Sequence, residues 1–186
     1  MSRITLVSAG VAVVAVSATL AAWSVSSASP MVEGRTAAST ATFRLMKQPE
    51  SAADRSARAF YTGSIPTDLS NSRLLGTDAS GRRYLLASDG ADMCLVVLRS
   101  RESAGVVCNP ASEIVTRTLW TEFGDDQVSY VATAVSDEYS DAKVITTGRV
   151  VLHEKNLVLV KTRGKGQDNV TLDGPTYAPL EIKTRG

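Results

Sequence analysis

The pattern of apolar and polar residues divides the chain into an uncharged N-terminal segment and a longer region of alternating character. From Ile4 to Trp23 twenty consecutive residues carry no charge, and Arg3 stands just before them. A run of this length just suffices to cross the hydrocarbon layer of a membrane. A basic start, an apolar run and small residues up to Ala28 are equally typical of a cleaved secretory signal. Residues 1–28 are therefore predicted to be either a signal peptide or a transmembrane anchor.

Both alternatives predict the same location for the rest of the chain. The positive-inside rule keeps Arg3 in the cytoplasm and places everything after Ser29 outside. No cysteine stands near the cleavage site, which excludes a lipoprotein. Residues 29–48 are rich in Ser, Ala and Thr and have no sustained period, so we expect a linker there. Residues 49–186 are expected to form an extracytoplasmic domain, either anchored to the membrane through residues 4–23 or secreted.

The clearest helical pattern lies at the start of this domain. Residues 50–61 contain several helix-compatible alanines, Pro49 and Glu50 suit a first turn, and a segment with Gly and Pro follows. One face of the predicted helix carries Ala53, Ala57, Phe60 and Tyr61. We expect this face to pack on a sheet.

Short runs rich in Val, Leu and Thr, separated by turn residues, follow from Leu74 onward. Asn109 and Pro110 are expected to open a short helical turn as its N-cap and first residue. Strand spacing of this kind predicts a mostly β (α+β) fold, in which the short helix packs on an antiparallel sheet, sandwich or open barrel. The strand candidates are residues 83–88, 93–98, 105–108, 116–123, 127–135, 143–147, 149–153 and 157–162.

The chain has two cysteines, Cys94 and Cys108. If residues 93–108 fold as a hairpin about a polar loop, Cys94 faces Cys108 and Val96 faces Val106. The sulfurs then lie on one face of adjacent strands, where an oxidising compartment favours a disulfide. A redox pair would show C-x-x-C spacing, and a zinc site would need more ligands than a chain with one histidine offers. The sequence therefore predicts a structural disulfide.

This hairpin also carries a resemblance. The segments Gly90-Ala-Asp-Met-Cys94-Leu-Val-Val-Leu98 and Ala104-Gly-Val-Val-Cys108-Asn-Pro110 resemble a Cys-Leu-Val-Val and Gly-x-x-Cys-x-Pro pattern of small exported or membrane-anchored proteins of actinobacteria. The strand, polar turn and strand of residues 130–146 are similar to that group as well. The resemblance covers roughly residues 73–162 and implies export and a disulfide, and it brings no catalytic residues with it.

Composition and charge narrow the classes of partner. Hydrophobic residues make up 44% of the chain, which is typical of a globular protein. Removing residues 1–28 takes away one positive charge and lowers the formal net charge from +1 to 0, which argues against nucleic acid as a partner. Charge is nevertheless uneven, with a net of −6 over residues 50–141 and +4 over residues 143–186.

The basic C-terminal part repeats a Lys-Thr-Arg-Gly motif, which begins at Lys161 and again at Lys183. The motif indicates either a weak site for anionic wall polymers or lipid headgroups, or a solvated turn and a free tail.

Few residues are candidates for catalysis or metal binding. His153 is the single histidine and is expected to be a polar residue at a strand end, although a Ser-His-Asp or Cys-His site would have to use it. Acidic residues cluster at Asp125 and Asp126 and again at Asp137, Glu138 and Asp141. Such clusters serve glycoside hydrolysis or calcium binding in other proteins, but solvated turn residues are the simpler interpretation. The sequence assigns no catalytic residue, cofactor or metal.

These observations predict a non-enzymatic domain of the cell envelope that binds an unidentified protein or polymer partner. Two alternatives stay open at this point. One is a small extracellular hydrolase that uses the acidic turns, and the other is a passive membrane-anchored stem or sensor domain. The identity of the partner and the oligomeric state do not follow from the sequence.

Overall fold

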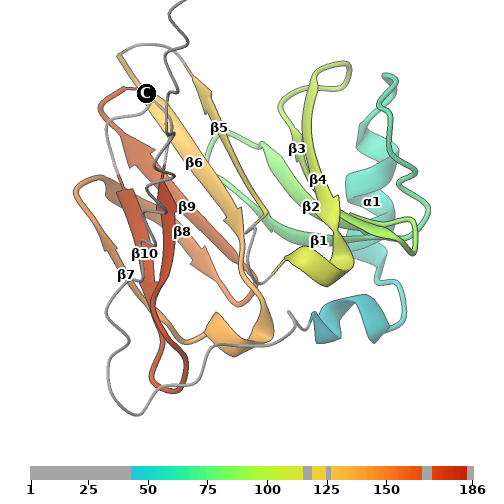
Figure 1. Ribbon diagram of the computed structural model, residues 1–186. Coiled ribbons are helices and arrows are strands. Elements are labelled where there is room, and N and C mark those ends of the chain that lie inside the picture. Colours follow the sequence, from blue (N-terminus) through green and yellow to red (C-terminus); the bar gives the residue numbers. More distant parts are fainter. Residues whose placement is uncertain (1–42, 115–118, 125–126, 165–168, 184–186) are drawn as a thin grey trace, which may run out of the picture. The chain divides into compact units, whose positions relative to one another are not determined.

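The computed structural model describes residues 43–114, 119–124, 127–164 and 169–183 (Figure 1). All of them belong to one compact unit. Across these ranges the fold contains one short α-helix and three antiparallel sheets, none of them closed. The predicted mostly β fold with a single short helix is thus confirmed. The predicted signal or anchor, residues 1–28, lies outside the described residues, and no helix within them is long and apolar enough to span a membrane.

The three sheets follow one another along the chain, apart from β7, which pairs with later strands. The first sheet consists of β1 (Ser72–Thr77), β2 (Arg83–Ser88), β3 (Asp92–Leu98) and β4 (Ala104–Pro110), in that order. The second has the order β5 (Trp120–Gly124), β6 (Ser129–Ala134), β9 (Leu157–Thr162) and β8 (Arg149–Glu154). The third has the order β11 (Leu180–Lys183), β10 (Asn169–Asp173) and β7 (Lys143–Thr146). The helical elements are η1 (Arg44–Lys47), α1 (Ala52–Phe60), η2 (Ala111–Glu113) and η3 (Asp137–Tyr139).

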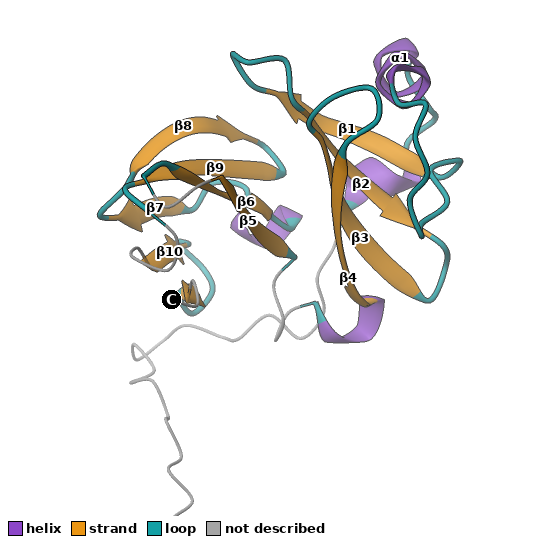
Figure 2. Ribbon diagram, turned by 90° about the horizontal axis from the view of Figure 1, so that it is seen from above, coloured by secondary structure: helices purple, strands orange, loops and turns teal. Residues whose placement is uncertain are grey.

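The central strands of the second sheet, β6 and β9, are buried on both faces over most of their length. One face meets the first sheet in a core of alternating apolar side chains, which includes Tyr84, Leu86, Leu95, Ala132 and Leu159 (Figure 2). The opposite face packs on the third sheet through a separate cluster that includes Val131, Val158, Val160, Val170 and Leu172. Burial on both faces explains why β9 begins with four consecutive apolar residues instead of an alternating pattern.

A glycine lets the first and second sheets approach each other closely. Gly76 follows a bulge in β1, and a β-carbon there would lie 3.0 Å from Leu157 Cδ2 and 3.2 Å from Leu152 Cδ2. Any larger residue would push these leucines away. The absence of a side chain at Gly76 therefore allows the two sheets to pack closely at this point.

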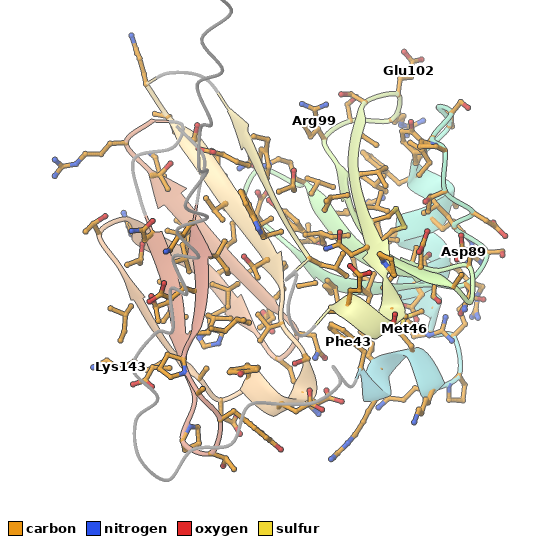
Figure 3. The ribbon with its side chains drawn as sticks, viewed as in Figure 1. Phe43, Met46, Asp89, Arg99, Glu102 and Lys143 are labelled. Atoms are coloured by element: carbon orange, nitrogen blue, oxygen red, sulfur yellow. A yellow bond between two sulfur atoms is a disulfide. The ribbon has the colours of Figure 1, made fainter. Side chains whose placement is uncertain are left out.

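The segment before α1 is part of the fold. Phe43 is buried in the core between the first and second sheets, and Met46 packs against the same core from η1 (Figure 3). These residues fall at the end of the range 29–48 that the sequence assigns to a linker. Burial of Phe43 therefore adds the last part of that range to the folded unit.

Helix α1 covers the outer face of the first sheet, as predicted. Ala57 is buried there with Leu85, Val96 and Leu98, and Phe60 packs against the same cluster. The prediction was wrong for Ala53, which is exposed. The helix begins at Ala52, two residues later than expected, because Ser51 is its N-cap and Asp54 completes a capping box.

Asp54 joins α1 to the edge of the first sheet. Its carboxylate accepts hydrogen bonds from the Ser51 amide at 2.6 Å and from the Leu74 amide of β1 at 2.7 Å. Burial alone would raise the pKa of this carboxyl, but these hydrogen bonds, aided by the positive charge of Arg73, outweigh burial and lower it below the usual 3.8. Arg73 itself is buried and donates to the carbonyl oxygen of Gln48, which ties the chain before α1 to β1.

The predicted disulfide is present. Cys94 and Cys108 are bonded, and they are direct partners in the β3–β4 pairing. Val96 pairs with Val106 and Leu98 with Ala104, so the whole predicted register is confirmed. The hydroxyl oxygen of Thr67 lies 3.2 Å from the Cys94 sulfur, where the loop after α1 crosses the bridge.

Several elements differ from the prediction. Strand β1 starts at Ser72, and strands β10 and β11 were not predicted at all. Lys183 lies in β11 and pairs with Asn169, so its assignment to a free tail was wrong, while residues 184–186 lie outside the described part. Pro110 still belongs to β4, and the helical turn η2 begins one residue later than expected.

Replacing Asp54 with alanine tests the capping network. The change leaves the Leu74 and Ser51 amides without their acceptor, so the free energy of unfolding at pH 7 should fall by about 1–3 kcal/mol. A carboxyl with a lowered pKa in the folded state stabilises the fold above its usual pKa, and this stabilisation disappears as the pH falls through the folded-state pKa. Urea unfolding at pH 7 and at about pH 2.5 should therefore show a difference that shrinks in acid.

The matched control is Asp141→Ala, which removes an exposed carboxylate and should change stability by less than about 0.5 kcal/mol. A difference between wild type and Asp54→Ala that is equal at both pH values would contradict the argument.

Removing both cysteines tests the disulfide. The bridge closes a loop between residues 14 positions apart, and the chain-entropy model assigns about 3 kcal/mol to a loop of this size. The variant Cys94→Ala/Cys108→Ala should be destabilised by that amount in urea unfolding. Reduced wild type is the control and should match it. Two free thiols in protein purified from the envelope would refute the bridge in the native protein.

Candidate functional site

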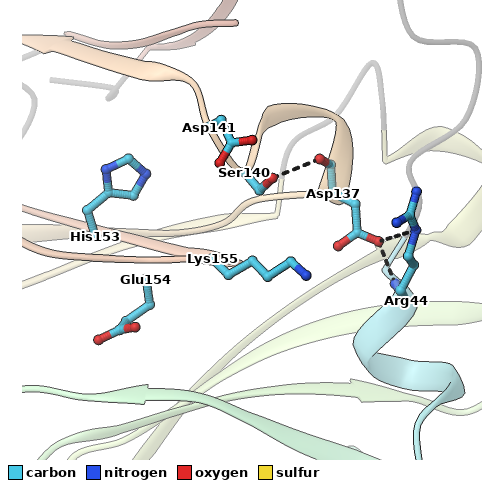
Figure 4. A pocket seen from close by; sticks show the side chains of 7 residues that line it. All are labelled: Arg44, Asp137, Ser140, Asp141, His153, Glu154 and Lys155. Atoms are coloured by element: carbon cyan, nitrogen blue, oxygen red, sulfur yellow. Dashed lines mark hydrogen bonds and ion pairs between the residues drawn. The ribbon is translucent and has the colours of Figure 1, made fainter.

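Two surface clefts contain four of the polar residues singled out above, Asp137, Asp141, His153 and Lys161. The first, which we call the η3 cleft, has a volume of about 620 Å³ and lies beside the turn between β6 and β7 (Figure 4). Both acidic and basic side chains face it. Its lining residues are Arg44, Asp137, Ser140, Asp141, His153, Glu154 and Lys155.

Asp137 is the structural centre of the η3 cleft. One carboxylate oxygen accepts from the Arg44 amide at 2.6 Å, and the other accepts from the Asn156 side-chain amide at 3.2 Å. Asn156 also donates to the carbonyl oxygen of Val135 at 2.8 Å. Asp137 thus connects η1, η3 and the β8–β9 turn, and both of its oxygens serve these connections.

His153 lies near the end of β8 with an exposed side chain, and it lines the η3 cleft. In Figure 4 its ring lies on the opposite side of the cleft from Asp137, and no hydrogen bond or ion pair joins the two. Glu138 lines a neighbouring cleft together with Asp141 and Tyr177. In the described part of the chain, no three His, Cys, Asp or Glu residues gather as a metal would require, so the acidic turn does not converge into a calcium site. Asp125 and Asp126 lie outside the described residues.

The second cleft, which we call the cationic groove, has a volume of about 510 Å³ and is lined by residues of β6, β9 and β8 in the second sheet. Three of its residues form a row across the sheet, because Lys161 of β9 is the partner of both Tyr130 in β6 and Arg149 in β8. The β1–β2 turn closes the other side. The full lining is Asp78, Ala79, Ser80, Arg82, Tyr130, Arg149, Val150, Val151, Leu159 and Lys161.

Arg82 forms a rigid, charged wall of the groove. Its guanidinium carbon lies 4.1 Å from the centre of the Tyr130 ring, and its Nε donates to Asp78 at 2.6 Å. Tyr84 also donates its hydroxyl to Asp78, at 2.9 Å. Burial alone would raise the pKa of Asp78, but the hydrogen bonds from Ser80, Arg82 and Tyr84 outweigh burial and lower it.

The pKa values of two partners of Asp78, Tyr84 and Arg82, are raised. Burial raises the pKa of the Tyr84 hydroxyl, and the hydrogen bond to Asp78 raises it further. Burial alone would lower the pKa of Arg82, but its hydrogen bond to Asp78 reverses the effect. Tyr84 is therefore neutral while Asp78 and Arg82 are charged. The wall of the groove consists of this ion pair and of the Tyr130 ring on which Arg82 stacks.

Arg149 and Lys161 form an unfavourable pair. They stand directly opposite each other on β8 and β9, where like charges destabilise a sheet. Within the described ranges, no acidic side chain forms an ion pair with either residue. Beside them the β8 pairing is interrupted by a bulge at Val151, and Val150 and Val151 are 37% and 41% exposed. Both valines line the same cleft as the two cations.

The sequence singled out only Lys161 among these groove residues. Arg82 comes from the β1–β2 turn, Tyr130 from β6 and Arg149 from β8, and no spacing along the chain relates them to Lys161. The excess of basic residues after position 143 was the available signal.

No known protein family, curated protein or solved structure matches this chain. The resemblance to exported actinobacterial proteins stays a prediction.

Two alanine variants separate structural from surface roles in the η3 cleft. Asp137→Ala removes the acceptor of the Arg44 amide and one of the two acceptors of the Asn156 side chain, so it should lower the free energy of unfolding by about 1–3 kcal/mol. His153→Ala removes an exposed side chain and should change it by less than about 0.5 kcal/mol. Urea unfolding of both variants is the measurement. Equal effects would show that Asp137 has no special structural role.

Proposed function

We propose that this chain is a non-enzymatic, extracytoplasmic domain of the cell envelope that binds a protein or polymer partner in the cationic groove. The uncharged segment from Ile4 to Trp23 supports export, and so does a disulfide in a domain of this size. The observation that carries the binding proposal is the combination of the Arg149–Lys161 pair with the exposed valines of the β8 bulge.

The apolar part of this argument depends on where exposed side chains gather. Among the described residues, the large hydrophobic side chains that are clearly exposed are Ile145, Val150 and Val151. A single exposed apolar residue is ordinary on any protein. Two neighbouring ones on an edge strand, next to a cleft and to charged residues, have the composition of a small interface with a polar rim.

The electrostatic part depends on repulsion. Holding Arg149 opposite Lys161 costs stability in the unbound domain. A bound anion would remove this cost. The groove should therefore bind a partner that carries negative charge.

A small hydrolase acting in the η3 cleft is the second candidate, because His153, Asp137 and Asp141 line one cleft. The two bonds of the Asp137 carboxylate to Arg44 and Asn156 favour a structural role for this residue. Turnover of an envelope polymer that is lost in His153→Gln, with unchanged unfolding, would favour the enzyme.

Site-specific photo-crosslinking in cells tests the binding proposal. Val151 is replaced by benzoylphenylalanine in the full chain, and the same replacement at Ile145 is the matched control. Ile145 is 49% exposed but lies on β7, away from the groove. Irradiation should give a covalent adduct of larger mass from position 151 and none from position 145. No adduct at position 151, or equal adducts at both, would refute binding at this surface.

A further inference from the structure

We infer that the cationic groove recognises phosphate groups carried by an envelope polymer. This inference rests on the proposed function and specifies the chemistry of its partner. It depends on the number and placement of charges in the groove, on the geometry of the cations, and on the limited apolar area beside them.

The groove has a clear excess of positive charge. Its lining contains three cationic residues and one acidic residue, which gives a net charge of +2. Asp78 pairs with Arg82, so the excess belongs to Arg149 and Lys161. Opposed residues of an antiparallel pair have β-carbons about 4.5–5.5 Å apart, which lets both side chains reach one anionic group between them.

The two cations differ in a way that suits phosphate. The planar guanidinium of Arg149 can grip two oxygens side by side, while the ammonium of Lys161 acts as a point charge that approaches from a second direction. A carboxylate has only two oxygens, both in one plane, and a bidentate arginine contacts both of them. A phosphate group is tetrahedral, so it can present oxygens to both strands at once.

The space around the cations argues for a polymer rather than a free ion. A cleft of about 510 Å³ is in the size range of sites for molecules much larger than inorganic phosphate. Val150 and Val151 offer apolar contact for an uncharged spacer between phosphates. Two partly exposed valines are too small an apolar area to hold the domain in a bilayer, which argues against a lipid as the main ligand.

Calorimetric titration of the full chain, purified in mild detergent, tests this inference with four probes. Inorganic polyphosphate supplies repeated phosphates, inorganic phosphate a single group, polyglutamate a chain of carboxylates, and vesicles with anionic phospholipid a membrane surface. Polyphosphate should bind at least about tenfold more tightly than polyglutamate and than inorganic phosphate, and its affinity should fall as salt is added.

The variant Arg149→Ala/Lys161→Ala should weaken polyphosphate binding at least about tenfold. Without ligand it should unfold at the same or a higher temperature than wild type, because the repulsive pair is gone. The matched control is Lys155→Ala, which removes an exposed lysine at the opposite end of the same hairpin and should change binding less than about twofold.

Several outcomes would overturn the inference. Equal binding of polyglutamate would mean that the groove accepts carboxylates, and the proposed binding function would stand without phosphate. Binding only to vesicles would assign the groove to lipid. Unchanged polyphosphate binding in the double variant, or a large loss of its stability, would remove these residues as a binding site, and crosslinking at position 151 would then decide the proposed function separately.

Discussion

The packing of the first sheet against the second positions every feature discussed above. Tyr84, Leu86 and Leu95 meet Ala132 and Leu159 in this core. The cationic groove lies between the β1–β2 turn and strands β6, β9 and β8 of the second sheet. Its polar wall is therefore continuous with the core, since Tyr84 is buried within it and still donates its hydroxyl to Asp78. The Asp78–Arg82 pair is therefore held in place before any partner arrives.

Two hairpins show which parts of this structure follow from sequence and which do not. The β3–β4 register follows from simple reflection about a polar loop, because no bulge interrupts it and both cysteines fall on one face. The same procedure gives the wrong register for the β8–β9 hairpin. Counting back from the Glu154–Leu157 pair without a bulge would place Arg149 opposite Thr162. The bulge at Val151 shifts the register by one residue and brings Arg149 opposite Lys161 instead. The center of the proposed site thus depends on a local irregularity that periodicity does not reveal.

Strands β10 and β11 were missed for a related reason. Val170 and Leu172 are apolar residues separated by a single threonine, in a stretch otherwise rich in polar residues and glycine. They become a strand only because the second sheet offers a second apolar face for them to cover. The continuous apolar run of β9 was the sign of that second face, since a strand with one solvated side would alternate.

The attachment of Arg44 to Asp137 has a mechanical consequence. If the N-terminal segment stays in the membrane, any tension along the chain enters the described fold at Phe43 and Arg44. Their anchorage is the burial of Phe43 in the first core and the short hydrogen bond from the Arg44 amide to the η3 carboxylate. A pull would therefore be borne by the turn between β6 and β7 and shared with the β8–β9 turn through Asn156, while the disulfide-linked hairpin lies off this route. Such a pull would thus reach the sheet that carries the groove through two of its turns, and it would bypass the disulfide-linked hairpin.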